Sequence, residues 1–326
     1  MYRIGFFIYE GCYLSSFSGP IDAFQIANAF AQKQLGNNTD AFFSWSTIGL
    51  NKEPITTSCG IRLTPDTDIS AQESFDLLYI PSFPYKGIEV FEQLATQLTP
   101  SFDWLKNAWE DGTVICSNCT SAFILAETGL LNDKLATTAW WLERVFANRY
   151  PNVNLDITQL ITEQDNIVCA GAGNSHQNLA MNLIEKQFSK ELAIQCAKTL
   201  MVDARLAAQS PYQNLLTAAP SEDPVIQKAQ HWLHTHMNSN IDLAWLASDL
   251  GVSQRTLIRK FKAELDETPI RYLQNIRIEA AKSLLETTKM PIPEIVEQVG
   301  YSDLSAFSKL FKQRTQLTPK GYRLLF

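Results

Sequence analysis

The chain contains no long apolar run. Of its 326 residues, 45% are hydrophobic and 19% are charged, and no run approaches the ~18 residues that a membrane helix needs. The N-terminal segment 1–9 is apolar, but it is too short for a signal peptide and lacks a small-residue cleavage site. We therefore expect no membrane segment and interpret Arg3–Tyr9 as a buried first strand.

Cysteine and histidine are also scarce. Six cysteines are scattered without a compact framework, which favours a reduced, cytoplasmic setting over secretion. Three of the four histidines (His231, His234 and His236) cluster, but no cysteine or carboxylate stands at ligand spacing, so a solvated helix face is the better interpretation than a metal site. Gly171-Ala172-Gly173 lacks the downstream spacing of a dinucleotide loop. The sequence predicts no metal and no cofactor.

Net positive charge is absent as well, because the whole chain carries −7. The charge is uneven, however. Residues 1–220 hold 13 basic and 22 acidic side chains, whereas residues 251–326 hold 13 basic and 8 acidic ones. A positive excess confined to one module is enough to attract nucleic-acid phosphates.

The last third of the chain contains an internal repeat. Phe261-Lys262, Thr268-Pro269 and Tyr272 recur fifty residues later as Phe311-Lys312, Thr318-Pro319 and Tyr322. In each copy an apolar helix precedes a glycine, Gly251 or Gly300, and a second helix with basic and small polar residues follows. This pattern predicts two helix-turn-helix motifs, and therefore a protein that binds double-stranded DNA at two places.

Seven helices are expected in this C-terminal part, and two of them are recognition helices. Gln254–Leu265 and Asp303–Gln313 follow the two glycine turns. The other five expected helices are Val225–Met237, Leu243–Leu250, Pro269–Glu286, Pro293–Val299 and Pro319–Leu324.

The outward faces of the recognition helices carry the candidate DNA contacts. Arginine binds guanine bidentately, and lysine and hydroxyl groups contact base edges or phosphates. A solvated basic face is the alternative, but the duplication makes it a poor explanation. The predicted contacts are Arg255, Thr256, Arg259, Lys260, Ser305, Ser308, Lys309 and Lys312.

Residues 224–326 resemble the AraC/XylS family of transcription regulators, most strongly from Ile295 to Pro319. The resemblance implies that the two recognition helices enter successive major grooves, and it makes RNA polymerase a candidate partner. It places base contacts on Arg255, Thr256, Arg259, Ser305, Ser308 and Lys309. Ile258 stands where some relatives carry a polar reader, so thymine-methyl contacts or DNA shape are expected to compensate.

The first 180 residues alternate apolar runs with amphipathic stretches, which predicts an α/β fold with a flavodoxin-like, doubly wound parallel sheet. We expect a ligand-sensing domain at 1–189, a connecting helix and linker at 190–223, with the helix spanning Lys190–Ala208, and an all-α DNA-binding domain at 224–326. The expected strands are Arg3–Tyr9, Phe42–Leu50, Asp76–Pro81, Thr113–Asn118 and Asn166–Ala170, and the expected helices are Ile21–Gln34, Val90–Glu110, Thr120–Gly129, Trp140–Arg149 and His176–Phe188.

Cys119 stands where an apolar strand runs directly into a helix. Such a corner lifts a side chain above the sheet and directs backbone N–H groups toward it, an arrangement that lowers a thiol pKa. Cys116 and Cys119 have thioredoxin-like spacing, but Cys116 lies within the strand, so coincidence is the better explanation and a redox switch the lesser one.

Four segments resemble the ThiJ/PfpI-type, class I glutamine-amidotransferase-like superfamily: 19–24, 119–126, 129–131 and 136–138. Joined to an AraC-type tail, they are similar to the GlxA-type regulators, in which this domain is a sensor. Superfamily enzymes place a histidine after the Thr-Thr pair and a carboxylate in the first loop, but here these positions are Ala139 and Ser16. The resemblance therefore implies a non-enzymatic sensor; a Cys119-dependent hydrolase or glyoxalase is the alternative, with His176 as the one other candidate base.

The ligand site is expected among loops at the carboxyl edge of the sheet, where aromatic residues are frequent. Aromatic faces attract cations, so an amine or amino-acid derivative is the hypothetical effector. The resemblance also implies a homodimer and a regulator that activates transcription. The predicted ligand contacts are Ser16, Phe17, Tyr85, Cys119, Thr120, Ser121 and Trp140.

Overall fold

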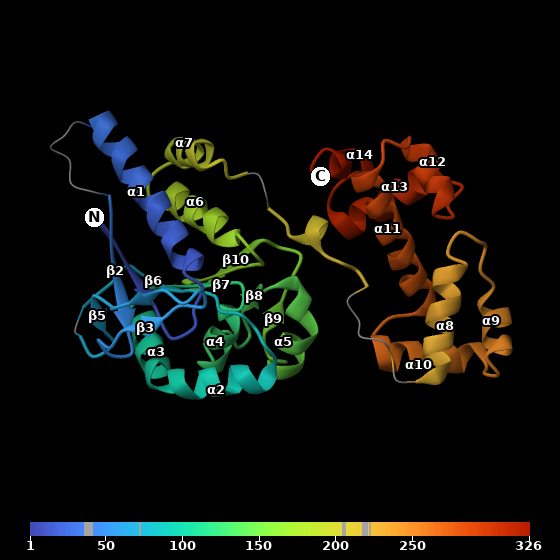
Figure 1. The fold of residues 1–326 in the computed structure, drawn as a ribbon, viewed down its shortest axis with the longest axis horizontal. Helices are drawn as coiled ribbons and strands as arrows, with labels where there is room; N and C mark the ends of the chain where they lie inside the picture. Colours follow the sequence, from blue (N-terminus) through green and yellow to red (C-terminus); the bar gives the residue numbers. More distant parts are fainter. Residues whose placement is uncertain (36–41, 72, 204–206, 217–220, 222) are drawn as a thin grey trace. The chain divides into compact units, whose positions relative to one another are not determined.

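The computed structural model describes residues 1–35, 42–71, 73–203, 207–216, 221 and 223–326, and it divides the chain into two compact units (Figure 1). The first unit is Met1–Gln209 and the second is Ser210–Phe326. The proline-containing linker predicted near residue 220 lies largely outside the described residues.

The first unit is built on a seven-stranded sheet with strand order β10-β11-β7-β6-β1-β2-β5. Every residue of β6 and of β11 is buried, as expected for strands covered on both faces. All neighbouring strands of this sheet are parallel except β10, which pairs antiparallel with β11. The sequence analysis did not predict strand β10. The strands are β1 (Tyr2–Phe7), β2 (Phe43–Gly49), β5 (Thr67–Asp68), β6 (Leu77–Ile80), β7 (Val114–Asn118), β10 (Ile161–Gln164) and β11 (Ile167–Ala170), and two small pairs are formed by β3 (Ile55–Thr56) with β4 (Arg62–Leu63) and by β8 (Leu135–Ala136) with β9 (Asn154–Leu155).

Helices cover both faces of this sheet, which confirms the doubly wound α/β prediction. In Figure 1, α1, α6 and α7 lie on one face and α2 to α5 on the other. The helices are α1 (Ser15–Leu35), α2 (Ile88–Leu98), α3 (Phe102–Glu110), α4 (Ser121–Glu127), α5 (Glu143–Arg149), α6 (Ser175–Gln187) and α7 (Lys190–Leu200), with 3-10 turns at Thr99–Ser101 and Trp140–Leu142.

Two helix predictions for this unit were too long. The predicted helix Val90–Glu110 is split at Thr99–Ser101, where Pro100 lacks the backbone N–H that a continuous helix would use. The predicted helix Lys190–Ala208 ends at Leu200, where Met201 takes a left-handed conformation with φ of 53°.

The end of the first unit is extended rather than helical. Ala208 forms an antiparallel bridge with Gln159. On either side, Leu160 N donates to Ala207 O at 3.1 Å and Gln209 N donates to Thr158 O at 3.0 Å. Helix α7, which the sequence predicts as part of the connecting segment, packs into the core of the first unit.

The described residues of the second unit form a 3-10 turn at Ser210–Tyr212 and seven α-helices, which match those predicted to within a few residues. The recognition helix α10 has the predicted bounds. The helices are α8 (Pro224–Thr235), α9 (Leu243–Asp249), α10 (Gln254–Leu265), α11 (Pro269–Thr287), α12 (Ile292–Gln298), α13 (Leu304–Thr315) and α14 (Pro319–Arg323).

Repeated capping residues explain why the two motifs start and stop alike. Thr268 and Thr318 each accept a backbone hydrogen bond from the following helix and precede a proline at its first position. Each such cap stabilises a helix by about 1 kcal/mol. Asp266 and Gln316 end the two recognition helices in the left-handed conformation.

Each motif has a core of its own, and α11 contributes to both. Leu257 and Phe261 belong to the first core, while Phe307 and Phe311 belong to the second, and all four are fully buried. The segment that opens the second unit is bound to α11, since Leu215 N donates to a Glu279 carboxylate oxygen at 3.0 Å.

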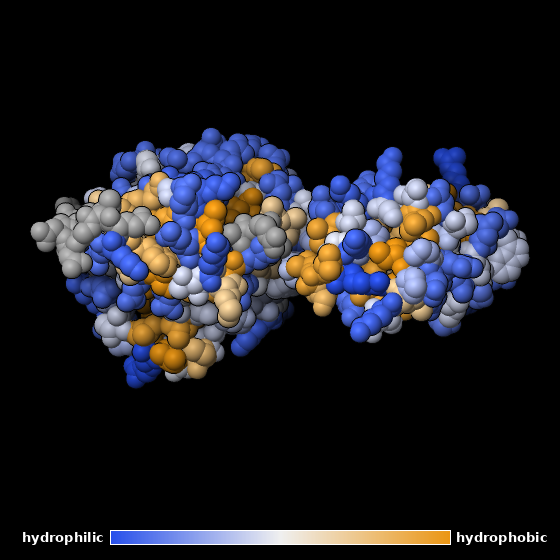
Figure 2. Space-filling view, turned by 90° about the horizontal axis from the view of Figure 1, so that it is seen from above, coloured by the Kyte–Doolittle hydropathy of each residue, from blue (hydrophilic) through white to orange (hydrophobic). Residues whose placement is uncertain are grey.

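Hydrophilic side chains cover most of the face shown in Figure 2, and apolar residues form separate patches between them. Within the described parts of the chain, no helix is both long and apolar enough to cross a membrane.

Candidate nucleic-acid interface and ligand site

Helix α10 presents one continuous outward face. Arg255, Ile258, Arg259, Lys262 and Ala263 line a shallow hollow of about 560 Å³, and all five side chains are exposed. Their spacing of three and four residues places them along one side of the helix. Lys262 was not among the predicted contacts, although its position seven residues after Arg255 identifies it.

Lys260 is not among the residues that line this face, and its predicted DNA contact stays a prediction. Its ammonium group forms an ion pair with the carboxylate of Asp223, the residue that caps α8. In the second motif the corresponding position is Leu310, which packs against the core. The position therefore points inward in both copies, because it lies more than a quarter-turn from Arg259 on the helix.

Thr256 lies at the start of α10 and is half-buried. Its hydroxyl oxygen lies 2.9 Å from that of Ser253, which caps the helix. Thr256 therefore takes part in the cap at the start of the helix, and its predicted DNA contact stays a prediction.

Helix α13 repeats the face of α10 with different side chains. Ser305, Lys309 and Lys312 are exposed and Ser308 is half-buried. In the fifty-residue repeat, Ser305 corresponds to Arg255, Ser308 to Ile258, Lys309 to Arg259 and Lys312 to Lys262. The structure thus brings every predicted contact of the second motif onto one face.

A hydrogen-bonded clamp joins the two motifs. Arg277 of α11 donates from Nε to Met237 O at 2.7 Å and from Nη2 to Ser239 O at 2.8 Å. The same guanidinium lies 5.0 Å from the centre of the Tyr301 ring. Gly300 approaches this loop so closely that a Cβ atom there would lie 2.8 Å from Asn238 Cα.

In the first unit, Cys119 occupies the strained corner that the sequence predicts. Its φ is 55°, a left-handed value, and its side chain is buried. Burial raises the pKa of the Cys119 thiol, although backbone groups of Gly173 and Thr120 oppose the change. The predicted lowering of this pKa is wrong, because desolvation outweighs the N–H groups at the corner.

Three predicted ligand contacts use their hydroxyl groups inside the protein. Ser16 Oγ donates to Asn118 Oδ1 at 3.0 Å and accepts a hydrogen bond from Ser82 N. Thr120 Oγ1 donates to Phe83 O at 2.7 Å, and Ser121 Oγ lies 2.7 Å from Ile80 O. These hydroxyl groups hold the loops around Cys119 together.

The aromatic candidates differ in exposure. Phe17 is buried and lies 6.4 Å from Phe6, centre to centre. Tyr85 and Trp140 are half-buried, and Trp140 makes an edge contact with Trp141 at 5.4 Å. Tyr85 and Trp140 therefore keep part of their ring surface exposed, whereas Phe17 packs in the core.

His176, the one other candidate base, is buried at the start of α6. Burial lowers the pKa of His176 from 6.5 to about 4, although a backbone hydrogen bond with Gly173 acts in the opposite direction and raises it. The imidazole is therefore neutral at neutral pH. With a thiol whose pKa is raised, neither group carries the charge of a thiolate–imidazolium pair.

Sequence reasoning missed Gln209, the last residue of the first unit. Its buried amide donates from Nε2 to Thr137 Oγ1 and to Thr138 O, both at 3.0 Å, and Oε1 accepts from Ala172 N at 3.1 Å. Thr138 in turn donates from Oγ1 to Cys119 O at 2.8 Å. Two consecutive hydrogen bonds through Thr138 therefore connect Cys119 with Gln209, and no local pattern signals a contact across seventy residues.

Known proteins share both parts of this architecture. The model of the DJ-1/PfpI family matches residues 2–186, more than half of the chain. The chain belongs to the DJ-1/PfpI family. This family member also carries a helix-turn-helix domain, matched at residues 246–324, which is of the AraC type.

Two relatives of this DJ-1/PfpI protein match it along almost its full length. It is 24% identical to the HTH-type transcriptional regulator CdhR of Pseudomonas aeruginosa, over 98% of this chain and 90% of the relative. It is 22% identical to the HTH-type transcriptional regulator GbdR of the same species, over 98% of this chain and 83% of the relative.

A solved structure, that of a putative transcriptional regulator protein from Vibrio parahaemolyticus, has the same fold as part of this chain. The TM-score is 0.52 at 21% identity, and the match covers 61% of this chain and 98% of the other.

Proposed function

We propose that this helix-turn-helix transcription regulator reads one operator at two places, through the outward faces of α10 and α13. The equivalence of these two faces carries the proposal. Both expose basic residues at corresponding positions, Arg259 and Lys309, and Lys262 and Lys312. The Arg277 clamp keeps the motifs in a fixed relation, which suits successive major grooves one helical repeat (~34 Å) apart.

We further propose that a small metabolite bound beside Cys119 controls DNA binding. Tyr85 and Trp140 supply partly exposed rings, and ring faces attract cations. An amine or amino-acid derivative is therefore the class of effector to test first. A homodimer, contact with RNA polymerase and activation of transcription are predictions that belong to the same proposal.

The ligand site is proposed to bind rather than to convert its ligand. The raised pKa of the Cys119 thiol and the lowered pKa of His176 leave no activated nucleophile at neutral pH. Ala139 and Ser16 stand where superfamily enzymes carry a base and an acid, and both are buried. A Cys119-dependent enzyme would need chemistry that these residues do not supply.

The proposed route from the ligand site to the second unit is the hydrogen-bonded chain Cys119–Thr138–Gln209. Gln209 is immediately followed by Ser210, where the second unit begins. A ligand that displaces the Thr138 loop would release the Gln209 amide and free the extended segment that ends the first unit. The effector would thus act by binding the anchored and released states with different affinities.

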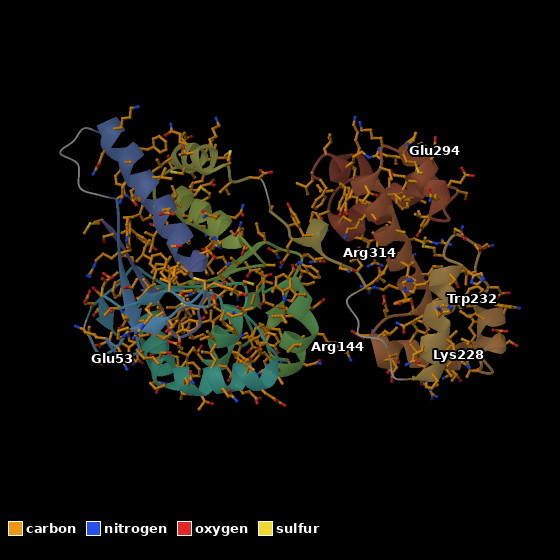
Figure 3. The ribbon with its side chains drawn as sticks, viewed as in Figure 1. Glu53, Arg144, Lys228, Trp232, Glu294 and Arg314 are labelled. Atoms are coloured by element: carbon orange, nitrogen blue, oxygen red, sulfur yellow. The ribbon has the colours of Figure 1, made fainter. Side chains whose placement is uncertain are left out.

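The DNA proposal is tested by selecting a preferred duplex from random DNA with the full-length protein and footprinting it. We expect two protected segments on one face of the duplex. Arg259→Ala should weaken protection of one segment and Lys309→Ala that of the other. Lys228 on α8 (Figure 3) lies outside both recognition helices, so Lys228→Ala is the control and should preserve both. A single protected segment that both variants affect equally would contradict the proposal.

The ligand proposal is tested by thermal unfolding of the full-length protein with amines, amino acids, quaternary ammonium compounds and aldehydes. A ligand at 100 times its Kd stabilises the folded state by about 2.7 kcal/mol. Binding should survive Cys119→Ala and weaken in Trp140→Ala. Turnover of a glyoxal or an amide that disappears in Cys119→Ala would overturn the binding role.

The route through Gln209 has its own test. Gln209→Ala should leave effector binding in place but abolish the effect of the effector on DNA affinity. Gln187→Ala, at an exposed position of α6, is the matched control and should retain the full response. An unchanged response in Gln209→Ala would remove the route while leaving the ligand site intact.

A further inference from the structure

Ile258 is an apolar residue at the centre of the outward face of α10. Its side chain is 36% exposed, whereas Leu257 and Phe261 of the same helix are fully buried. Arg255 precedes it by three residues and Arg259 follows it directly, and all three line the same shallow hollow. Ile258 does not belong to the core of the first motif, and apart from Ala263 its neighbours on this face are basic.

The second motif carries a different residue at the equivalent position. The position that corresponds to Ile258 in α13 is Ser308, so the two recognition helices differ in chemistry at the centre of equivalent faces. Serine donates and accepts hydrogen bonds, but isoleucine does neither. The two halves of an operator cannot be read by the same contacts at this position.

In the major groove, the one apolar group among the base edges is the C5-methyl group of thymine. An apolar side chain within a DNA-reading face therefore discriminates in favour of thymine by burying that methyl group. The flanking arginines suit guanine O6 and N7, or phosphates, on either side of it. A hydrogen-bonding base edge placed against Ile258 would lose its water without gaining a partner.

We infer that Ile258 makes the first motif specific for a thymine, recognised through its methyl group, while Ser308 gives the second motif a polar contact at the equivalent place. The inference rests on the proposed role of α10 in DNA binding.

The test uses the duplex that the full-length protein selects. Each thymine is replaced in turn by deoxyuridine, which removes only the C5-methyl group. One position in the half-site of α10 should then bind about three- to fourfold more weakly, as expected for one buried methyl group. Ile258→Ser should bind the thymine and uracil duplexes equally, and Ser308→Ile should gain sensitivity in the other half-site.

Ile270→Ser is the matched control. Ile270 is also exposed, at 43%, but it lies at the start of α11, outside the recognition faces, so this variant should keep the wild-type response. Unchanged melting temperatures would show that all three variants fold.

Equal binding of every uracil duplex by the wild type would overturn the inference, as would a full methyl response in Ile258→Ser. Failure to select any duplex would instead refute the proposed function, so the two failures are distinguishable.

Discussion

The two turn glycines of the repeat offer a matched pair of perturbations with different expected costs. Gly251 and Gly300 both have left-handed φ, 71° and 84°. A Cβ atom at Gly251 would meet nothing within 4 Å, whereas one at Gly300 would lie 2.8 to 2.9 Å from the backbone of Asn238. Alanine at either position therefore strains the backbone, but only alanine at Gly300 also pushes on the loop between α8 and α9.

The difference in free energy follows from these contacts. A left-handed alanine costs roughly 1–2 kcal/mol, which is the whole cost expected for Gly251→Ala. Gly300→Ala must in addition move Asn238, which lies between the Met237 and Ser239 carbonyls that Arg277 holds. Losing those two hydrogen bonds adds about 1 kcal/mol each, so the total is roughly 3–4 kcal/mol.

Hydrogen exchange of the α10 and α13 amides in the full-length protein measures both costs, because it resolves the second unit from the first. We expect Gly251→Ala to lower protection modestly and Gly300→Ala to lower it far more. Gly300→Ala should also weaken binding to a duplex carrying both half-sites more than binding to either half-site alone, since the clamp no longer holds the motifs together. Equal losses of protection in the two variants would refute the reasoning.

Three further predictions follow from single side chains. Arg259→Ala should weaken specific DNA binding by roughly 1–3 kcal/mol and relax discrimination at one base pair in a binding-site selection; an unchanged specificity profile would contradict its role. Lys260→Leu, which introduces the residue found at the same place in the second motif, should leave that profile unaltered, and a changed base preference would show that Lys260 contacts a base. The depressed pKa of His176, about 4 against 6.5, stabilises the fold fully above pH 6.5, and this contribution is lost as the pH falls toward 4, by about 1.4 kcal/mol per pH unit. An NMR titration should find its imidazole neutral at pH 5, and a midpoint near 6.5 would show that it is solvated.

Many helices and turns of this protein could be predicted from the sequence, because the interactions that form them join residues close together in the chain. The fifty-residue repeat, the Thr-Pro starts of α11 and α14 and the apolar spacing of α9 and α12 predicted two helix-turn-helix motifs, and α10 was placed at its observed bounds. Capping hydrogen bonds and buried helical stripes depend on neighbours within one or two turns. The sharp strand-to-helix corner at Cys119 was predicted for the same reason.

The features that could not be predicted from the sequence depend on contacts between residues that are distant along the chain. No sequence pattern indicated the ion pair that the fold forms between Lys260 and Asp223. The Cys119 thiol was predicted to have a lowered pKa, whereas burial raises it. The edge strand β10 and the extended segment ending at Gln209 exist through pairing with other segments, and no periodicity encodes that pairing. Tertiary structure decided these features because the cost of desolvation and the choice of hydrogen-bond partner are set by what packs around a residue.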